Sequence, residues 1–164
     1  MTILKDIANI ALIGVGATVV MDLWLALLKR MGAKTLDIAF LGRWVGHVFQ
    51  GKFTHTSIGK APPIPGELVL GWFTHYVVGI AFAGLLVGIT GINWMIDPTV
   101  WPAILVGMST VVAPLFVMQP SMGSGFAASK TPTPLKNCAR SVVNHTIFGL
   151  GLYLSAALIA WVLR

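Results

Sequence analysis

Apolar residues dominate four long stretches of the chain, and each stretch is long enough to form a helix that crosses a lipid bilayer. The stretches cover residues 7–28, 67–91, 99–117 and 137–163. A membrane core about 30 Å thick needs about 20 helical residues, because each residue advances a helix by about 1.5 Å. The pattern therefore predicts an all-α integral membrane protein in which the whole chain, residues 1–164, forms one four-helix bundle.

A shorter amphipathic segment, residues 36–50, lies between the first and second stretches. Its apolar residues recur at helical spacing, and Arg43, His47 and Gln50 form a polar stripe opposite them. The segment is too short to cross a membrane, so we expect a short helix that lies in the membrane interface.

Prolines and glycines predict where the helices are interrupted. Residues 59–67 include three prolines, so we expect an extended connection up to Glu67, whose carboxylate suits the N-terminus of the second span. Pro114 lacks the N–H group that a helix needs and predicts a kink near the end of the third span. The glycines and prolines of residues 118–134 predict an irregular loop before the fourth span.

Composition supports a membrane protein and excludes an ordinary soluble domain. Hydrophobic residues make up 56% of the chain, charged residues only 10%, and the mean hydropathy is +0.85. A soluble domain has about 25% charged residues. Cys138 is the single cysteine, which excludes an intramolecular disulfide and a cysteine-based zinc site, and we expect it to be a small buried residue.

Basic residues predict the orientation of the spans. Most of them lie either between spans one and two or around the start of span four: Lys29, Arg30, Lys34, Arg43, Lys52, Lys60, Lys130, Lys136 and Arg140. Only Lys5 and Arg164 lie on the other side. Basic loops tend to stay in the cytoplasm, so both termini are expected to face outward, and the net charge of +6 also favours contact with anionic lipid headgroups. No interleaved basic and aromatic pattern outside the membrane predicts nucleic-acid binding.

We expect the first span to remain in the protein as a signal anchor. It is longer than the apolar region of a signal peptide, and no separate cleavage region of small residues follows it.

Asp22, His75 and His145 are ionisable residues inside the predicted spans. Such a residue costs about 3 kcal/mol or more in hydrocarbon, so each one needs a partner, a water-filled cavity or a function. From the helical rise, both histidines lie about 12 Å from the cytoplasmic start of their spans, and Asp22 lies about 9 Å from the cytoplasmic end of its span. The pattern predicts that three polar side chains from three helices share one depth.

Two interpretations of these three residues stay open. One is a site that opens to the cytoplasm and binds a small solute, a proton or a metal ion, since two imidazoles and a carboxylate can ligate a transition metal. Two facing histidines could also ligate haem, but the chain has no haem attachment motif, and haem is disfavoured. The other interpretation is a hydrogen-bonded core that only fixes the packing of the helices.

Four polar residues are candidates for the mouth of this site: Arg43, His47, Gln119 and Arg140. Arg43 and His47 share one stripe of the short helix and could cover the site or contact lipid phosphate. Arg140 could pair with Asp22, or its side chain could extend to the headgroups. We expect His47 and His55 to be exposed to solvent.

Small residues on the second span permit close helix packing. Gly84 and Gly88 are four residues apart and therefore share a helix face. Packing within the bundle is one interpretation, and a homodimer through this face is the other.

The two halves of the chain resemble each other weakly. Residues 75–81 and 145–151 both read His, three residues, Gly, an aliphatic residue and a small residue. Two helical-hairpin repeats would explain the match. Chance matching in a restricted composition is the alternative.

Several motifs together resemble a known family. They are Gly42-Arg43-Trp44 through His47, Pro62-Pro63 to Glu67, Gly71-Trp72 to His75-Tyr76, Met118-Gln119-Pro120 through Pro132, and His145 to Tyr153. Over essentially the whole chain the pattern resembles the small bacterial inner-membrane proteins grouped as domain of unknown function 2938. The resemblance implies a bacterial four-span protein and brings no cofactor, catalytic residue or biochemical role.

The sequence therefore favours a multi-pass protein of the bacterial inner membrane that binds or passes a small solute, a proton or a metal ion. A structural or accessory membrane subunit without a ligand is the first alternative, and a lipid-active membrane enzyme is the second. An enzyme with a soluble substrate is disfavoured, because no nucleophile lies at a readable spacing from a base and no phosphate-binding fingerprint is present.

Overall fold

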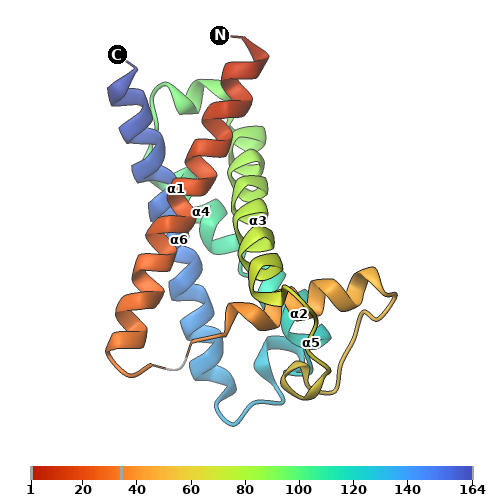
Figure 1. Ribbon diagram of the computed structural model, residues 1–164. Coiled ribbons are helices and arrows are strands. Elements are labelled where there is room, and N and C mark those ends of the chain that lie inside the picture. Colours follow the sequence, from red (N-terminus) through yellow and green to blue (C-terminus); the bar gives the residue numbers. More distant parts are fainter. Residues whose placement is uncertain (1, 34, 164) are drawn as a thin grey trace. The chain divides into compact units, whose positions relative to one another are not determined.

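The computed structural model describes residues 2–33 and 35–163, and every regular element within them is a helix (Figure 1). Four helical segments are long and apolar enough to cross a membrane: Ile3–Arg30, Glu67–Thr90, Val100–Ser121 and Pro134–Val162. The prediction of an all-α protein with four spans is confirmed, and each end of a span lies within four residues of its predicted position. Lys34 and Arg164, two of the basic residues used to predict orientation, lie outside the described residues.

The elements follow one another in this order: α1 (Ile3–Arg30), α2 (Ile38–Phe49), η1 (Ile58–Lys60), α3 (Glu67–Thr90), η2 (Ile92–Met95), α4 (Val100–Ser109), η3 (Ala113–Met118), α5 (Gln119–Ser121), η4 (Phe126–Ala128) and α6 (Pro134–Val162). The elements η1, η2 and η4 are single 3₁₀ turns, whereas η3 is a π-helical turn. The short helix predicted between spans one and two is confirmed as α2, while its position in a membrane interface stays a prediction.

The third span contains the interruption that Pro114 predicts. Regular α-helix ends at Ser109, the backbone forms a turn at Thr110, and π-helical geometry runs from Ala113 to Met118. Thr110 is four residues before Pro114, so its carbonyl loses the N–H partner that a regular helix would supply. A π-helical turn is a common adjustment beside such a missing hydrogen bond.

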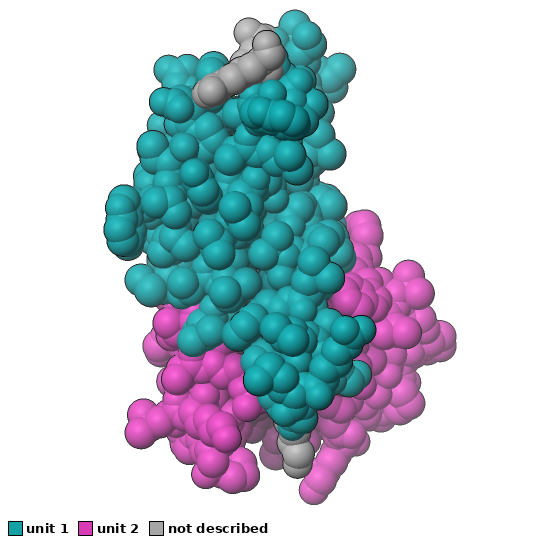
Figure 2. All heavy atoms as spheres, turned by 90° about the vertical axis from the view of Figure 1, so that its left-hand side faces the viewer, with its two compact units in different colours: residues 1–33, 76–110, 143–164 teal, residues 34–75, 111–142 magenta. Residues whose placement is uncertain are grey.

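The described chain divides into two compact units, coloured separately in Figure 2. Unit 1 comprises residues 1–33, 76–110 and 143–164, and therefore holds α1, most of α3, α4 and most of α6. Its core is formed by apolar side chains from all four of these helices and from η2: Ile13, Ala17, Ala83, Leu86, Val87, Trp94, Met95, Ala103, Val106, Phe148, Leu152 and Ala156. Figure 1 places the first turn of α1 and the last turn of α6 at the same end of unit 1.

Glycines allow the helices of unit 1 to approach closely. A Cβ atom added to Gly14 of α1 would overlap the backbone of α3 at Ile80, and one added to Gly107 of α4 would overlap the backbone of α6 at Gly149. Small residues have this role in membrane proteins, where close backbone contact replaces the hydrophobic effect as the main source of helix association.

Large apolar side chains cover the outside of unit 1. Leu23 is 67% exposed, Leu158 is 60% exposed and Trp161 is 73% exposed. Hydrocarbon is a favourable environment for such side chains, so this surface supports a membrane protein. The sidedness of the termini and loops stays a prediction.

Unit 2 comprises residues 34–75 and 111–142, and holds α2, η1, the first turns of α3, η3, α5, η4 and the start of α6. Helix α2 packs against the start of α3 through two glycines. A Cβ atom on Gly42 would overlap the carbonyl oxygen of Glu67, and one on Gly71 would overlap the carbonyl oxygen of Ile38. As predicted, Glu67 is the first residue of α3.

Candidate functional site

Asp22 of α1 is hydrogen-bonded to a tyrosine of α3 in unit 1. The hydroxyl group of Tyr76 donates to Oδ2 of Asp22 at 3.0 Å, and both side chains are partly buried. The bond stabilises a carboxylate oxygen by a donor that carries no charge. It also links α1 to α3.

His145 of α6 is hydrogen-bonded to a threonine of α4, also within unit 1. Nδ1 of His145 lies 2.8 Å from Oγ1 of Thr110, and that hydroxyl donates to the carbonyl oxygen of Gly107 at 2.5 Å. A hydroxyl group carries a single hydrogen, so Thr110 accepts from the imidazole and Nδ1 carries the proton. In a neutral ring with this tautomer, Nε2 of His145 is the acceptor nitrogen.

A third hydrogen bond joins residues that are close in the sequence to Asp22 and His145. Nε1 of Trp24 donates to Oδ1 of Asn144 at 3.0 Å and so links α1 to α6. Trp24 is two residues from Asp22, and Asn144 is the neighbour of His145. Three side-chain bonds thus link α3 to α1, α1 to α6 and α6 to α4.

We call the six residues of these bonds the polar layer: Asp22, Trp24, Tyr76, Thr110, Asn144 and His145. Sequence analysis singled out Asp22 and His145 and missed their hydroxyl partners. A hydroxyl-bearing residue next to a predicted intramembrane group is the signal that could have found Tyr76, which follows His75. No comparable signal marks Thr110, which has the composition of an ordinary span residue.

His75 belongs to unit 2, whereas Asp22 and His145 belong to unit 1. Its ring is partly buried and lies edge-on to the ring of Trp72, with the centroids 6.0 Å apart. The prediction that His75 shares a site with the other two residues stays a prediction.

A metal site was one interpretation of the ionisable residues in the spans. Across residues 2–33 and 35–163, no group of three or more His, Cys, Asp or Glu residues is arranged so that it could hold a metal ion. Ligation of a metal ion by Asp22, His75 and His145 stays a prediction.

Arg43 forms an ion pair with Glu67 in unit 2. Nη2 lies 2.7 Å from Oε1, Nε donates to Oε2 at 2.8 Å, and the two side chains are only 11% and 17% exposed. The hydrogen bond that Arg43 donates to Glu67 raises the pKa of the Arg43 guanidinium, while burial acts in the opposite direction. Nη1 also donates to the carbonyl oxygens of Ile58 at 3.3 Å and of Ala61 at 3.1 Å. Arg43 thus links α2 to the connection that precedes α3.

His47 and His55 form a buried pair, so the prediction that both are exposed is wrong. His47 is 5% exposed and His55 is 9% exposed, and Nδ1 of His47 lies 2.8 Å from Nε2 of His55. The connection after α2 returns to the polar stripe of that helix, which shields both rings from solvent. Burial lowers the pKa of His55, and the charges of His47 and Lys52 lower it further, against an opposing contribution from the Ser121 backbone.

The other candidates for the mouth of the site also lie in unit 2. Gln119 begins α5, and its buried Oε1 has no hydrogen-bond partner among the described residues. Arg140 is half-buried on α6. Cys138 is partly buried and its thiol donates to the carbonyl oxygen of Ala127 at 3.0 Å. The structure leaves the grouping of Arg43, His47, Gln119 and Arg140 around one opening as a prediction.

Comparison with known proteins identifies the family. A family model described as "Protein of unknown function (DUF2938)" matches residues 11–159, about nine-tenths of the chain. No curated protein and no solved structure matches the chain. The resemblance seen in the sequence motifs is therefore confirmed, and this chain belongs to the family of proteins of unknown function called DUF2938.

Proposed function

We propose that this membrane protein binds or passes a proton, alone or together with a small solute, at the polar layer of unit 1. Asp22 and Nε2 of His145 are the proton acceptors in this proposal. The observation that supports it most is that each of these ionisable groups is oriented by a hydroxyl group from another helix, at 3.0 Å for Tyr76 and 2.8 Å for Thr110.

The choice of residue types favours proton binding over a purely structural layer. A neutral pair such as Trp24 and Asn144 is sufficient to link two helices by a hydrogen bond. Asp22 and His145 add groups that can change charge within a span, and ionisable residues in such positions are costly and usually functional. A hydroxyl partner can accept or donate, so it can stabilise both protonation states of its neighbour.

Access from the cytoplasm is part of the proposal. The prediction of cytoplasmic basic loops places the polar layer nearer to the inner surface of the membrane. Asp22 and His145 are both only partly buried within unit 1.

Proton flux into liposomes tests the proposal. The purified protein is reconstituted with a pH-sensitive dye inside the vesicles, and a membrane potential is imposed. We expect the native protein to pass protons and Asp22→Asn to lower the rate by about 100-fold, the scale of a lost proton acceptor. Asn keeps an oxygen that accepts from Tyr76, so the hydrogen bond between α1 and α3 is retained in this variant.

Tyr76→Phe is the matched control, because it removes the hydrogen bond and leaves the carboxyl group of Asp22 in place. Its flux should remain well above that of Asp22→Asn. Proton binding is rejected if neither the native protein nor Tyr76→Phe passes protons and if the native protein takes up no proton on acidification.

A structural subunit is the second candidate, and the neutral bond between Trp24 and Asn144 favours it. It predicts that Asp22→Asn, Tyr76→Phe and Trp24→Phe all lower the melting temperature in detergent and that none of them changes proton uptake. The two candidates therefore differ in the outcome for Asp22→Asn.

A further inference from the structure

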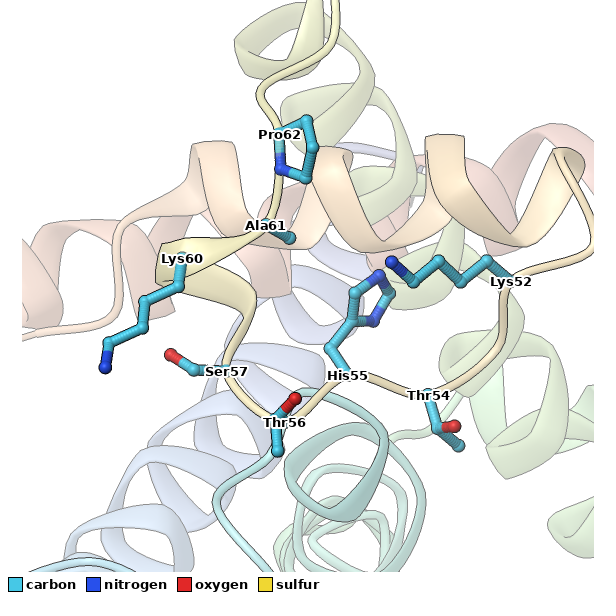
Figure 3. Close-up of a pocket in the computed structure, with 8 residues that line it drawn as sticks. All are labelled: Lys52, Thr54, His55, Thr56, Ser57, Lys60, Ala61 and Pro62. Carbon is cyan, nitrogen blue, oxygen red and sulfur yellow. The ribbon is translucent and has the colours of Figure 1, made fainter.

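Unit 2 contains a basic pocket in the connection between α2 and α3. Its volume is about 250 Å³, and its lining residues are Lys52, Thr54, His55, Thr56, Ser57, Lys60, Ala61 and Pro62 (Figure 3). We call this cavity the basic pocket. Two ammonium groups and three hydroxyl groups supply hydrogen-bond donors, and no acidic side chain is among the lining residues.

The lining segment is held in place before any ligand binds. The indole N–H of Trp44 donates to the carbonyl oxygen of Phe53 at 3.0 Å, and Arg43 donates to the carbonyl oxygen of Ala61 at 3.1 Å. The backbone N–H of Ile58 donates to the carbonyl oxygen of Met122 at 2.9 Å. These bonds fix both ends and the middle of the segment, so a ligand would not have to order it.

His55 is the buried histidine among the lining residues of the basic pocket. Its backbone N–H donates to the carbonyl oxygen of Ser121 at 2.8 Å, and its ring is paired with His47. Nδ1 of His55 is buried and has no hydrogen-bond partner among the described residues. Figure 3 shows the side chain of Lys52 extending toward this ring. A buried polar atom without a partner usually indicates a bound water, ion or ligand group close by.

The cations of the basic pocket remain available for a ligand. Lys52 and Lys60 are exposed, and neither ammonium group makes a hydrogen bond or an ion pair within the described part of the chain. Arg43 differs, because its guanidinium is already paired with Glu67. Lys52 and Lys60 are therefore better candidates than Arg43 for contact with lipid phosphate.

We propose that the basic pocket binds a phosphate group, carried either by an anionic phospholipid headgroup or by free phosphate. Ammonium and hydroxyl donors are suited to phosphate oxygens, and charge-assisted hydrogen bonds to phosphate are short and strong. The net charge of +6 and the predicted cytoplasmic position of the connection would bring the pocket close to anionic lipid.

Lipid retention tests the site. The full-length protein is prepared in detergent with mixtures of phosphatidylglycerol and phosphatidylcholine, and bound lipid is counted by native mass spectrometry. The test variant is Lys52→Gln combined with Lys60→Gln. The matched control is Lys130→Gln combined with Lys136→Gln, which removes the same charge from exposed residues of unit 2 outside the pocket. A further variant, Ser57→Ala, removes a pocket donor without changing the charge.

Inorganic phosphate is the second probe, followed by ³¹P NMR line broadening. If a headgroup is the source, the test variant should retain about tenfold less phosphatidylglycerol than the native protein, which corresponds to about 1.4 kcal/mol. The control should retain nearly the native amount, and Ser57→Ala should have an intermediate effect. If free phosphate is the source, the protein should broaden the phosphate line, and only the pocket variants should remove the broadening.

Two results would overturn the proposal. One is an equal loss of phosphatidylglycerol in the test and control variants, which would show attraction by diffuse charge alone. The other is the absence of a pocket-dependent effect on either probe in variants that melt at the native temperature.

Discussion

The ion pair between Arg43 and Glu67 should control the local stability of the connection between α2 and α3. The perturbation is Glu67→Gln, which keeps the size of the side chain and removes its charge. The bonds of Arg43 at 2.7 and 2.8 Å would then lose their anionic acceptor, and one of the two acceptor oxygens would be replaced by an amide nitrogen. The other two bonds of Arg43, to the carbonyl oxygens of Ile58 and Ala61, would remain. A guanidinium that is 11% exposed would be left without an anionic partner.

The size of the effect follows from these contacts. Gln still offers one acceptor oxygen, so we expect a loss of about 2 kcal/mol, within the range for hydrogen bonds to charged groups. Each 1.4 kcal/mol changes an equilibrium tenfold, so the open form of the connection should become about 30-fold more populated.

Limited proteolysis measures this opening. Trypsin cleaves after Lys52 and Lys60, and its rate reports the population of the open form when opening and closing are fast. Cleavage at these two lysines should accelerate by about 30-fold in Glu67→Gln. Cleavage at Lys130, which lies on a different loop of unit 2, should change much less. If the rates at Lys52 and Lys60 match those of the native protein, the ion pair does not hold the connection and the reasoning is refuted.

Two further predictions concern the buried histidine and the packing glycines. Because the pKa of His55 is lowered below its ordinary value of about 6.5, the unfolded chain binds the proton more tightly, so the stability of unit 2 should fall as pH decreases through about 6.5. Thermal melts between pH 8 and pH 5 should show this loss, and His55→Gln should reduce the slope; an unchanged slope would contradict it. Gly107→Ala should lower the unfolding free energy by about 1–3 kcal/mol, because the added Cβ atom would overlap the backbone of Gly149. Gly88→Ala is the control and should leave the unfolding free energy nearly unchanged, because no atom lies within 4 Å of its added Cβ atom. Equal losses for the two variants in chemical denaturation would refute close packing at Gly107.

The spans could be predicted from the sequence because one physical requirement determines them. A helix that crosses hydrocarbon needs a continuous apolar run, and that requirement is visible without any tertiary contact. Proline chemistry is equally local, so Pro114 predicted the interruption after Thr110. The preference of a carboxylate for a helix N-terminus is also local, so Glu67 predicted the start of α3.

The pairings could not be predicted, because they depend on how distant segments pack. Arg43 forms its ion pair with Glu67 because glycines allow α2 to pack closely against the start of α3. His47 and His55 were expected to be exposed, and they are buried because the connection folds back onto α2. Helical periodicity identified the polar stripe of α2 but not the segment that it contacts.

The polar layer could be predicted in part: the depth of its ionisable residues could be predicted, but their hydrogen-bond partners could not. Depth along each helix suggested a common level for Asp22 and His145, since the rise per residue is fixed. The choice of Tyr76 and Thr110 as partners depends on the rotation of each helix about its axis. A sequence without a packed structure does not fix that rotation.

The proposed function requires that Asp22 gain and lose a proton inside the membrane. Infrared difference spectroscopy on the reconstituted protein, between a neutral and an acidic pH, measures this directly. The account predicts a carboxylic-acid C=O band that appears on acidification, is missing in Asp22→Asn, and is shifted in Tyr76→Phe because the hydrogen bond at 3.0 Å is removed. A spectrum in which Asp22→Asn leaves every carboxyl band unchanged would contradict the account.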